Sequence, residues 1–496
     1  MRKVDYRAFV LAFIFSVPVV FGLRARIHNP DLFYHIRTGD WILQRHTVPH
    51  TDPFAQGGTQ RVFIAYSWLF DVATAKLYSA FGLMYVPLST VLLVVAIVLA
   101  LFLLIRSFGV GLVRTALLIL LAMVAMYPLL YLRTWLFTIL FFIVELWILF
   151  RPGGKPKTAL LVLPGIFVLW ANIHVQFSYG LFVLGLFVAE GILLRFTNSR
   201  LDSVAPQWNI KERALLFFVC GLATLVNPYG VGIYKVIAEY TSQKGMFPYI
   251  QETWPLNSFH PSYASCLIVT AAGIWYAGYY RERRPLVLLI FAWAMVTGFH
   301  LTRDSWVVCV ASCFVIAATS GDETKDRNPI RLPSVLVALS MVLILFAGLM
   351  VERHIDSRHL AASVSANYPV AAADFIERNH LSGPLFNTYS WGGYLMWRLT
   401  DLPVSIDGRA NVYGAARVER QRRTLGAASD WAQDPSLRTA RLILLPQNEA
   451  LTTLLKAHSC YRLAYSDSLS AVFTVRDDCS PLNCLAGSPA ESPDHP

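Results

Sequence analysis

The side chains best suited to chemistry lie in one polar segment that follows the first apolar run of this 496-residue sequence. Asp31 and His35 are four residues apart, so they share one face of a helix. A carboxylate and an imidazole in that arrangement suit general base catalysis, in which one group accepts a proton and the other orients it or shares the proton. We interpret Asp40 and Asp52, which follow in the same segment, mainly as turn and loop residues. The sequence therefore predicts Asp31 and His35 as the catalytic pair.

Further polar side chains that suit a charged or sugar ligand stand at the ends of later apolar runs or in the segments beyond them. Arginine is favoured for a phosphate because its planar guanidinium binds two oxygens at once. An arginine at a helix end can also serve only as an anchor that reaches the membrane interface, and a lone histidine is most often structural. Their convergence on one side of a membrane favours binding. The predicted substrate-binding residues are Arg133, Asn172, His174, Glu252, Arg303 and Trp391.

The elements that position these residues are apolar segments long enough to cross a membrane. The chain is 55% hydrophobic and 15% charged, with a mean hydropathy of +0.49, whereas a soluble protein carries about 25% charged residues. A bilayer core of about 30 Å needs about 20 apolar residues in one helix. About eleven such spans are predicted, at 7–23, 84–105, 113–131, 133–150, 158–173, 177–195, 213–227, 262–280, 285–300, 304–320 and 332–351.

The positions of the basic residues predict how the spans are oriented. Arg and Lys concentrate in alternate short loops, such as 106–114 and 151–157, and the positive-inside rule assigns these loops and the N-terminus to the cytoplasm. The first outer loop, 24–83, and the tail, 352–496, then lie outside. The net charge of +11 belongs to these orientation signals, so we exclude nucleic acid as a partner.

The tail is predicted to be a small soluble α/β domain, because helix and strand patterns alternate along it. The prediction places a helix at 370–379 and strands at 384–387, 404–406, 442–445 and 471–475. The oxidising compartment would permit a disulfide between Cys460 and Cys479, which the sequence leaves open. No Cys-x-x-Cys pair occurs, so a metal cluster is not predicted. Two domains result, 1–351 with the outer loop and 352–496.

With these residues in place, the sequence resembles a bacterial branch of the GT-C superfamily of polytopic membrane glycosyltransferases. The resemblance runs along most of the chain, and its blocks are specific when taken together. They are Asn29-Pro-Asp31 with His35 and Gly39-Asp-Trp41, Asp52-Pro-Phe54, Trp170-Ala-Asn172-Ile-His174, Asn227-Pro-Tyr-Gly230, Arg303, Tyr389-Ser-Trp-Gly-Gly-Tyr394 and Asp407-Gly-Arg409.

The resemblance implies transfer of a sugar from a polyprenyl-phosphate donor to a hydroxyl of a glycan, lipid or protein acceptor. The reaction would occur on the outer face of the bacterial cytoplasmic membrane. Asp31 matches the acidic position of the superfamily's first outer loop, although many members have two adjacent acidic residues where this chain has Pro-Asp-Leu. No cofactor is implied, and a divalent metal is left open.

Two other functions remain open at this stage. The first is a lipid or polysaccharide transporter or flippase, against which we count the lack of charged residues within the spans and of inverted repeats. The second is a catalytically inactive assembly protein that uses its outer domain for contacts.

Overall fold

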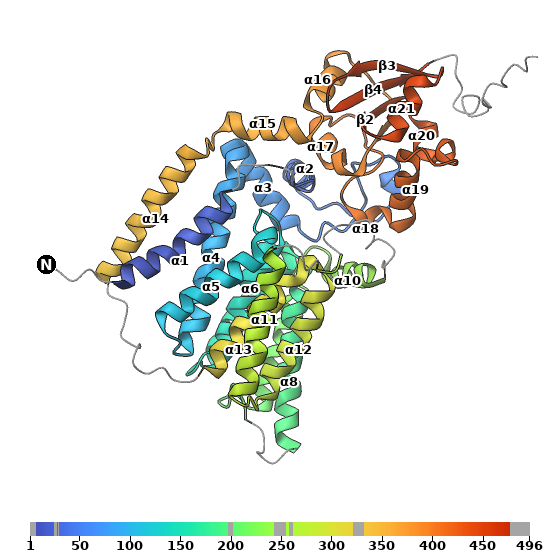
Figure 1. The fold of residues 1–496 in the computed structure, drawn as a ribbon. Helices are drawn as coiled ribbons and strands as arrows, with labels where there is room; N and C mark the ends of the chain where they lie inside the picture. Colours follow the sequence, from blue (N-terminus) through green and yellow to red (C-terminus); the bar gives the residue numbers. More distant parts are fainter. Residues whose placement is uncertain are drawn as a thin grey trace, which may run out of the picture.

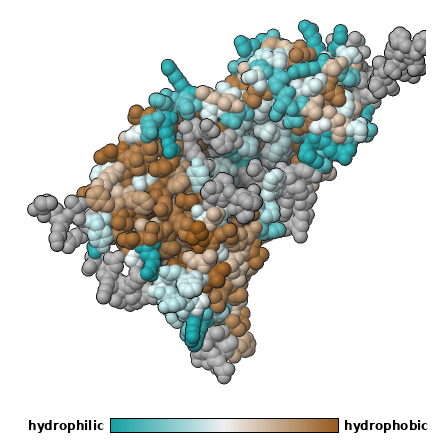
Figure 2. Space-filling view, viewed as in Figure 1, coloured by the Kyte–Doolittle hydropathy of each residue, from teal (hydrophilic) through white to brown (hydrophobic). Residues whose placement is uncertain are grey.

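The computed structural model describes residues 6–23, 27, 29–196, 202–242, 254–256, 261–320 and 332–476. A bundle of long helices forms the body, and a mixed domain of short helices and strands lies at one end of it (Figure 1). Hydrophobic side chains dominate the visible surface of the bundle, whereas hydrophilic ones dominate the mixed domain (Figure 2). The molecule is thus divided into an apolar body and a polar cap.

A helix coincides with each of the eleven predicted spans within the described part of the chain. Six helical stretches are long and apolar enough to cross a membrane, and α1, α6 and α12 are shorter apolar helices. The protein is therefore a multi-pass membrane protein. The helices are α1 (Tyr6–Gly22), α4 (Tyr85–Ser107), α5 (Leu112–Met126), α6 (Trp135–Phe150), α7 (Pro156–Ile173), α8 (Phe177–Phe196), α9 (Ile210–Ala223), α11 (Pro261–Tyr279), α12 (Pro285–His300), α13 (Ser305–Thr319) and α14 (Leu332–Glu352).

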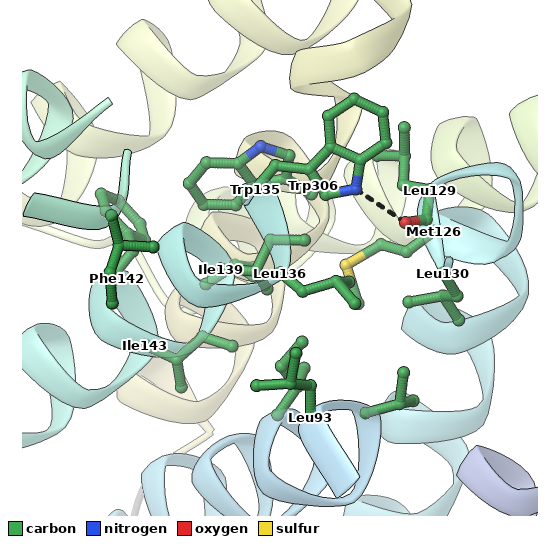
Figure 3. Close-up of a cluster of buried hydrophobic side chains, with 14 of the residues drawn as sticks. Leu93, Met126, Leu129, Leu130, Trp135, Leu136, Ile139, Phe142, Ile143 and Trp306 are labelled. Carbon is green, nitrogen blue, oxygen red and sulfur yellow. Dashed lines mark hydrogen bonds between the residues drawn. The ribbon is translucent and has the colours of Figure 1, made fainter. Parts of the chain in front are cut away.

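The core of the bundle lies around α6 and α13. Nearly every residue of α13 is buried, whereas α14 packs along α1 and exposes most of its apolar surface. Along α6, Trp135, Ile139 and Phe142 recur at helical spacing and point into a shared cluster (Figure 3). The Trp135 indole donates to the Leu129 carbonyl oxygen at 2.8 Å, so the polar atom of this buried ring has a partner.

Two fully buried carboxylates lie within the described parts of these helices, so the expectation that the spans lack charged residues was wrong. Glu145, in α6, is fully buried, and neither carboxyl oxygen has a hydrogen-bond partner among the described residues. Glu190, in α8, is also fully buried and pairs with Arg213 at 2.7 Å. Both residues were overlooked in the sequence because they stand among leucine and phenylalanine residues.

The first outer loop forms two helices, α2 (Leu32–Arg45) and α3 (Trp68–Phe81), which pack against each other. Gly39 permits the close approach, because a Cβ there would lie 2.0 Å from the backbone oxygen of Asp71. A helix, α10 (Ile233–Ser242), follows α9. Short 3-10 turns are η1 (Gly58–Gln60), η2 (Gly82–Met84), η3 (Tyr127–Leu129), η4 (Gly230–Gly232), η7 (Thr302–Asp304) and η9 (Trp431–Gln433).

The tail folds as the predicted α/β domain around a four-stranded sheet of order β1-β2-β4-β3, in which β1 and β2 are parallel and the other pairs antiparallel. The strands are β1 (Leu385–Asn387), β2 (Leu442–Pro446), β3 (Tyr461–Ser466) and β4 (Ser470–Val475). The helices are α15 (Ser357–Asn367), α16 (Val370–Arg378), α17 (Tyr389–Arg398), α18 (Ala410–Tyr413), α19 (Ala415–Leu425), α20 (Pro435–Thr439) and α21 (Ala450–Ala457).

Three predicted strands and the predicted helix match β1, β2, β4 and α16, while β3 was not predicted because it is mostly exposed and shows no clear alternation. The segment predicted as a strand at 404–406 forms only isolated bridges. Val404 pairs in parallel with Leu385 on one side and with Ala55 of the outer loop on the other. The outer loop therefore continues the sheet of the tail domain.

Cys460 is disulfide-bonded. The candidate partner, Cys479, lies outside the described residues. Four other cysteines, Cys220, Cys266, Cys309 and Cys313, are free and buried in the helical body.

Candidate active site

Asp31 lies at the turn that starts α2, where it meets the start of α6. Its carboxylate forms an ion pair with the Arg133 guanidinium. Asn29 joins the two residues, since its side-chain oxygen accepts from the Asp31 backbone N–H at 3.1 Å and from Arg133 Nε at 3.2 Å. The Asn29 amide also donates to the Leu132 carbonyl oxygen at 3.2 Å. The Asn-Pro-Asp block and Arg133, about 100 residues apart, thus form one unit.

This ion pair is placed where it can meet a ligand. The Asp31 side chain is 18% exposed and that of Arg133 9%. The Arg133 guanidinium also lies 4.6 Å from the ring centroid of Trp135, a cation–π contact that holds its plane.

The tail domain forms one wall around Asp31, and glycines make the close contact. A Cβ on Gly408 would lie 2.9 Å from the Asp31 carboxylate oxygen Oδ1, and one on Gly393 would lie 2.8 Å from the Pro30 carbonyl oxygen. A Cβ on Gly392 would lie only 2.0 Å from the carbonyl oxygen of Ile406. The glycines of Ser-Trp-Gly-Gly lie inside α17 and allow three segments to meet at Asp31.

His35 is oriented by a carboxylate of the neighbouring helix. Its Nδ1 lies 2.6 Å from Asp71 Oδ1, and the Ser67 hydroxyl donates to the same oxygen at 3.1 Å. Both His35 and Asp71 are buried. Among the described side chains the hydrogen-bond partner shown for His35 is Asp71, and the structure does not show the expected direct bond to Asp31. The acid that orients this imidazole is therefore Asp71.

His174 follows α7 and hydrogen-bonds to α6 through Thr138 at 2.8 Å from Nδ1. The Trp170 indole N–H donates to the same hydroxyl at 2.8 Å, so the hydroxyl hydrogen is available to His174. Burial, and then the charges of Arg303 and Arg133, lower the pKa of His174 to about 3. His174 is thus neutral and lies within the electrostatic reach of both predicted phosphate-binding arginines.

Arg303 stands at the start of α13 in a polar group that connects two helices. Its Nε lies 3.9 Å from the carboxylate of Asp304, and its side chain is 26% exposed. Asp304 is fully buried and accepts from the Gln176 amide at 2.7 Å and the Tyr179 hydroxyl at 2.9 Å. The more exposed guanidinium is therefore held near the surface by a buried, well-anchored carboxylate.

Asn172 is a structural tie at the wall of an open groove. Its oxygen accepts from the Trp68 indole at 2.6 Å, and its amide donates at 2.7 Å to the carbonyl oxygens of Val168 and Val226. The groove has a volume of about 470 Å³ and is lined mainly by apolar side chains. It is lined by Trp68, Leu69, Val168, Leu169, Asn172, Leu225, Val226, Asn227 and Pro228.

The remaining predicted binding residues are Trp391 and Glu252. Trp391 is 5% exposed, and its indole donates to the Asn367 carbonyl oxygen at 3.1 Å. It packs inside the tail domain. Glu252 falls outside the described residues. Among the described residues, no group of three or more His, Cys, Asp or Glu side chains has the arrangement of a metal site.

Comparison with solved structures identifies the architecture. The oligosaccharyltransferase of Archaeoglobus fulgidus superposes with a TM-score of 0.53 at 11% identity, over 96% of this chain and 75% of that one. The chain therefore shares the overall fold of this oligosaccharyltransferase. ArnT from Cupriavidus metallidurans, solved with undecaprenyl phosphate, gives a TM-score of 0.49 at 14% identity, over 98% of this chain and 99% of that one. No protein-family model matches the sequence. No curated protein matches it either.

Asp52 is not the ordinary loop residue that we expected. It is fully buried, and the Arg409 guanidinium contacts both of its oxygens, at 2.9 and 3.3 Å. The same guanidinium donates to Asp407 at 2.8 and 2.6 Å, and the Tyr413 hydroxyl donates to Asp407 at 2.6 Å. We call Asp52, Asp407, Arg409 and Tyr413 the clasp, because they join the outer loop to the tail domain.

Sequence reasoning missed Asp71 and Gly408 as parts of the site. Asp71 lies within the aromatic stretch 63–85, where a single carboxylate among apolar residues was the available signal. Gly408 was named only as the middle of Asp-Gly-Arg. The Asn-Pro-Tyr-Gly block has a structural role, since the Tyr229 hydroxyl donates to the Pro49 carbonyl oxygen at 2.8 Å and accepts from Ala65 N–H at 3.0 Å.

Proposed function

We propose that this protein is a membrane glycosyltransferase that moves a sugar from a polyprenyl-phosphate donor to an acceptor hydroxyl. The observation that carries the proposal is the partly exposed Asp31–Arg133 pair, placed at the junction of the helical body, the outer loop and the tail domain. An oligosaccharyltransferase shares the fold, which supports sugar transfer. The site would face the outside of a bacterial cytoplasmic membrane, with the N-terminus in the cytoplasm, because basic residues mark the opposite loops.

The donor is the part of the reaction for which the body of the protein is suited. A polyprenyl chain is long and apolar. The groove beside Trp68 and Asn172 offers an open apolar surface, and α3 and α7 form part of its wall. Trp68 begins α3, three residues before the Asp71 that orients His35. Arg303 and Arg133 would meet the donor phosphate, since both charges act on His174 and fixed guanidiniums stabilise the charge of a leaving phosphate.

In the proposed step, the acceptor oxygen forms a bond to the anomeric carbon as the bond from that carbon to the phosphate oxygen breaks. The acceptor proton goes to the Asp31 carboxylate, and the phosphate leaves with the bonding electron pair as polyprenyl phosphate. His35, held by Asp71, positions groups around the acceptor. Neutral His174 can donate a hydrogen bond without adding charge.

The test is release of polyprenyl phosphate by the purified protein with a defined donor and acceptor. Asp31→Asn removes the proton acceptor at nearly constant size, so we expect turnover to fall by roughly 100-fold or more. Asp40→Asn is the matched control, because it lies on the same helix, nine residues further on. Wild-type turnover in Asp31→Asn, measured on folded protein, would remove Asp31 from the mechanism.

A further inference from the structure

Three arginines lie near Tyr413 of the clasp: Arg417 and Arg420 in α19 of the tail domain, and Arg61 in the outer loop. The Tyr413 ring lies between two of them, with the guanidinium of Arg61 5.5 Å from its centroid and that of Arg417 at 5.4 Å. The third, Arg420, lies one turn along α19 from Arg417. The outer loop and the tail domain therefore both contribute charge to this place.

Like charges at close range oppose folding unless something offsets them. Burial, and then the charge of Arg61, lower the pKa of Arg417, and Arg420 lowers it further. Within the described residues, no carboxylate oxygen is found within 4 Å of Arg61, Arg417 or Arg420. The same helix shows the alternative, because Arg423 pairs with Asp430 at 2.9 Å.

A small enclosed pocket of about 60 Å³ lies beside these charges, with Arg417, Arg420, Ser405, Asp434 and Ser436 in its wall. That is room for a few waters or one small anionic group. Arg417 donates at 2.5 Å to the Ser405 carbonyl oxygen and at 3.4 Å to the Ser436 hydroxyl. The guanidinium is thereby fixed at the edge of the pocket.

Asp434 is the single carboxylate in the pocket wall, and its oxygens are already used. One accepts from the Ser436 backbone N–H at 2.8 Å and the other from the Thr424 hydroxyl at 2.9 Å. Arg61 is not in the pocket wall, but its guanidinium lies over the same Tyr413 ring as that of Arg417, and its Nη1 is buried without a hydrogen-bond partner among the described residues. Three guanidinium charges against one carboxylate leave an excess that suits a doubly charged anion.

We propose that Arg61, Arg417 and Arg420 bind a phosphate group of the acceptor. A short series of contacts links the pocket to Asp31. Arg417 lies over the Tyr413 ring, Tyr413 donates to Asp407 at 2.6 Å, and the adjacent Gly408 faces Asp31. A phosphate held here would bring a hydroxyl of the same acceptor toward Asp31. The assignment to the acceptor rests on the proposed function, whereas phosphate binding itself does not.

The test uses the full-length protein in phosphatidylcholine nanodiscs, with inorganic phosphate as the probe and no sugar donor present. Phosphate should raise the thermal midpoint of the wild type and of Arg423→Gln. It should bind at least about tenfold more weakly to Arg417→Gln and to Arg420→Gln, because each loses charged hydrogen bonds. Arg423→Gln is the matched control, since it removes the same charge from the same helix.

Equal phosphate binding by all four proteins, or no binding by the wild type, would overturn the proposal. Arg420 is exposed, so Arg420→Gln tests the site even where Arg417→Gln fails to fold. Repeating the titration with phosphatidic acid in the nanodiscs separates two sources of phosphate. A response lost in that membrane indicates a lipid headgroup, and a response retained indicates a soluble glycan phosphate. Both results are independent of the Asp31→Asn experiment.

Discussion

Two arginine–carboxylate groups tie the outer loop to other parts of the molecule, and they differ in how deeply they are buried. In the clasp, Arg409 and both aspartates are buried, and the guanidinium contacts four carboxylate oxygens. Asp31 and Arg133 also form an ion pair, but the Asp31 side chain remains 18% exposed. The first group has little capacity for a ligand, and the second has some.

The difference teaches that burial, rather than residue type, separates a structural ion cluster from a site. Asp31 and Asp52 lie in the same loop, and each neighbours a proline. A buried charge is tolerated where every donor and acceptor is matched, as in the clasp. A partly exposed pair retains solvent access and can exchange water for substrate.

The largest expected effect separates the two groups by stability. Arg409→Met leaves Asp52 and Asp407 buried without their counter-ion, so we expect a loss of about 3–5 kcal/mol in unfolding free energy. Arg133→Met removes the counter-ion of the Asp31 carboxylate, which water can reach. It should therefore lower the unfolding free energy by clearly less. Thermal unfolding of the two variants in the same detergent measures this contrast. Equal destabilisation would mean that the two groups do the same structural work.

The next effect separates them by activity. Arg133→Lys keeps the charge but loses the planar fork and the bond to Asn29, so we expect turnover to fall about tenfold to 100-fold with little loss of stability. Arg303→Lys should retain more donor affinity than Arg303→Ala for the same reason. Donor titrations with initial rates distinguish a change in KM from one in kcat. Unchanged rates in Arg133→Lys would return that residue to an anchoring role.

A smaller effect concerns the glycine that places the tail domain against Asp31. In Gly408→Ala, the new methyl group would meet the Asp31 carboxylate at 2.9 Å, so the carboxylate or the loop must shift. A small shift of a carboxylate that takes part in the reaction should lower turnover by about tenfold. Gly426→Ala is the control, because its Cβ would make only an ordinary contact, at 3.4 Å. Full activity of Gly408→Ala would separate the tail domain from the chemistry.

The sequence predicted the helical architecture well because length and apolarity determine which segments can cross a bilayer. Every predicted span corresponds to a helix, and the resemblance carried by Asp31, His35 and the later blocks led to the fold that the comparison found. Apolar pattern alone hid Glu145, since one carboxylate does not change the character of a helix rich in Phe, Ile and Leu.

Contacts between distant segments could not be predicted from the sequence. Nothing in Asp52-Pro-Phe or Asp407-Gly-Arg409 shows that the two blocks meet, because the chain between them is more than 350 residues long. His35 suggested Asp31 as its partner through helical spacing, yet the Asp71 carboxylate across a helix crossing lies closer to its ring. Local spacing ranks neighbours on one element and says little about partners on another.

The smallest expected effect is on the pH dependence of the clasp. Burial opposes ionisation of Asp407, but the adjacent Arg409 charge and its hydrogen bonds prevail and lower the pKa of Asp407. An aspartate in an unfolded chain titrates at about 3.9. A carboxylate with a lowered folded-state pKa contributes its stability above the unfolded value and loses it as the pH falls through the folded value. The clasp should therefore be unaffected between about pH 5 and 8 and weaken only below about pH 4.

Limited proteolysis of the wild type and of Asp407→Asn across this pH range measures how firmly the outer loop and the tail domain stay together. If the tail domain of the wild type were released near pH 6, the pKa of Asp407 would be raised rather than lowered. The clasp would then not be the stable buried ion cluster that we contrast with the Asp31–Arg133 pair.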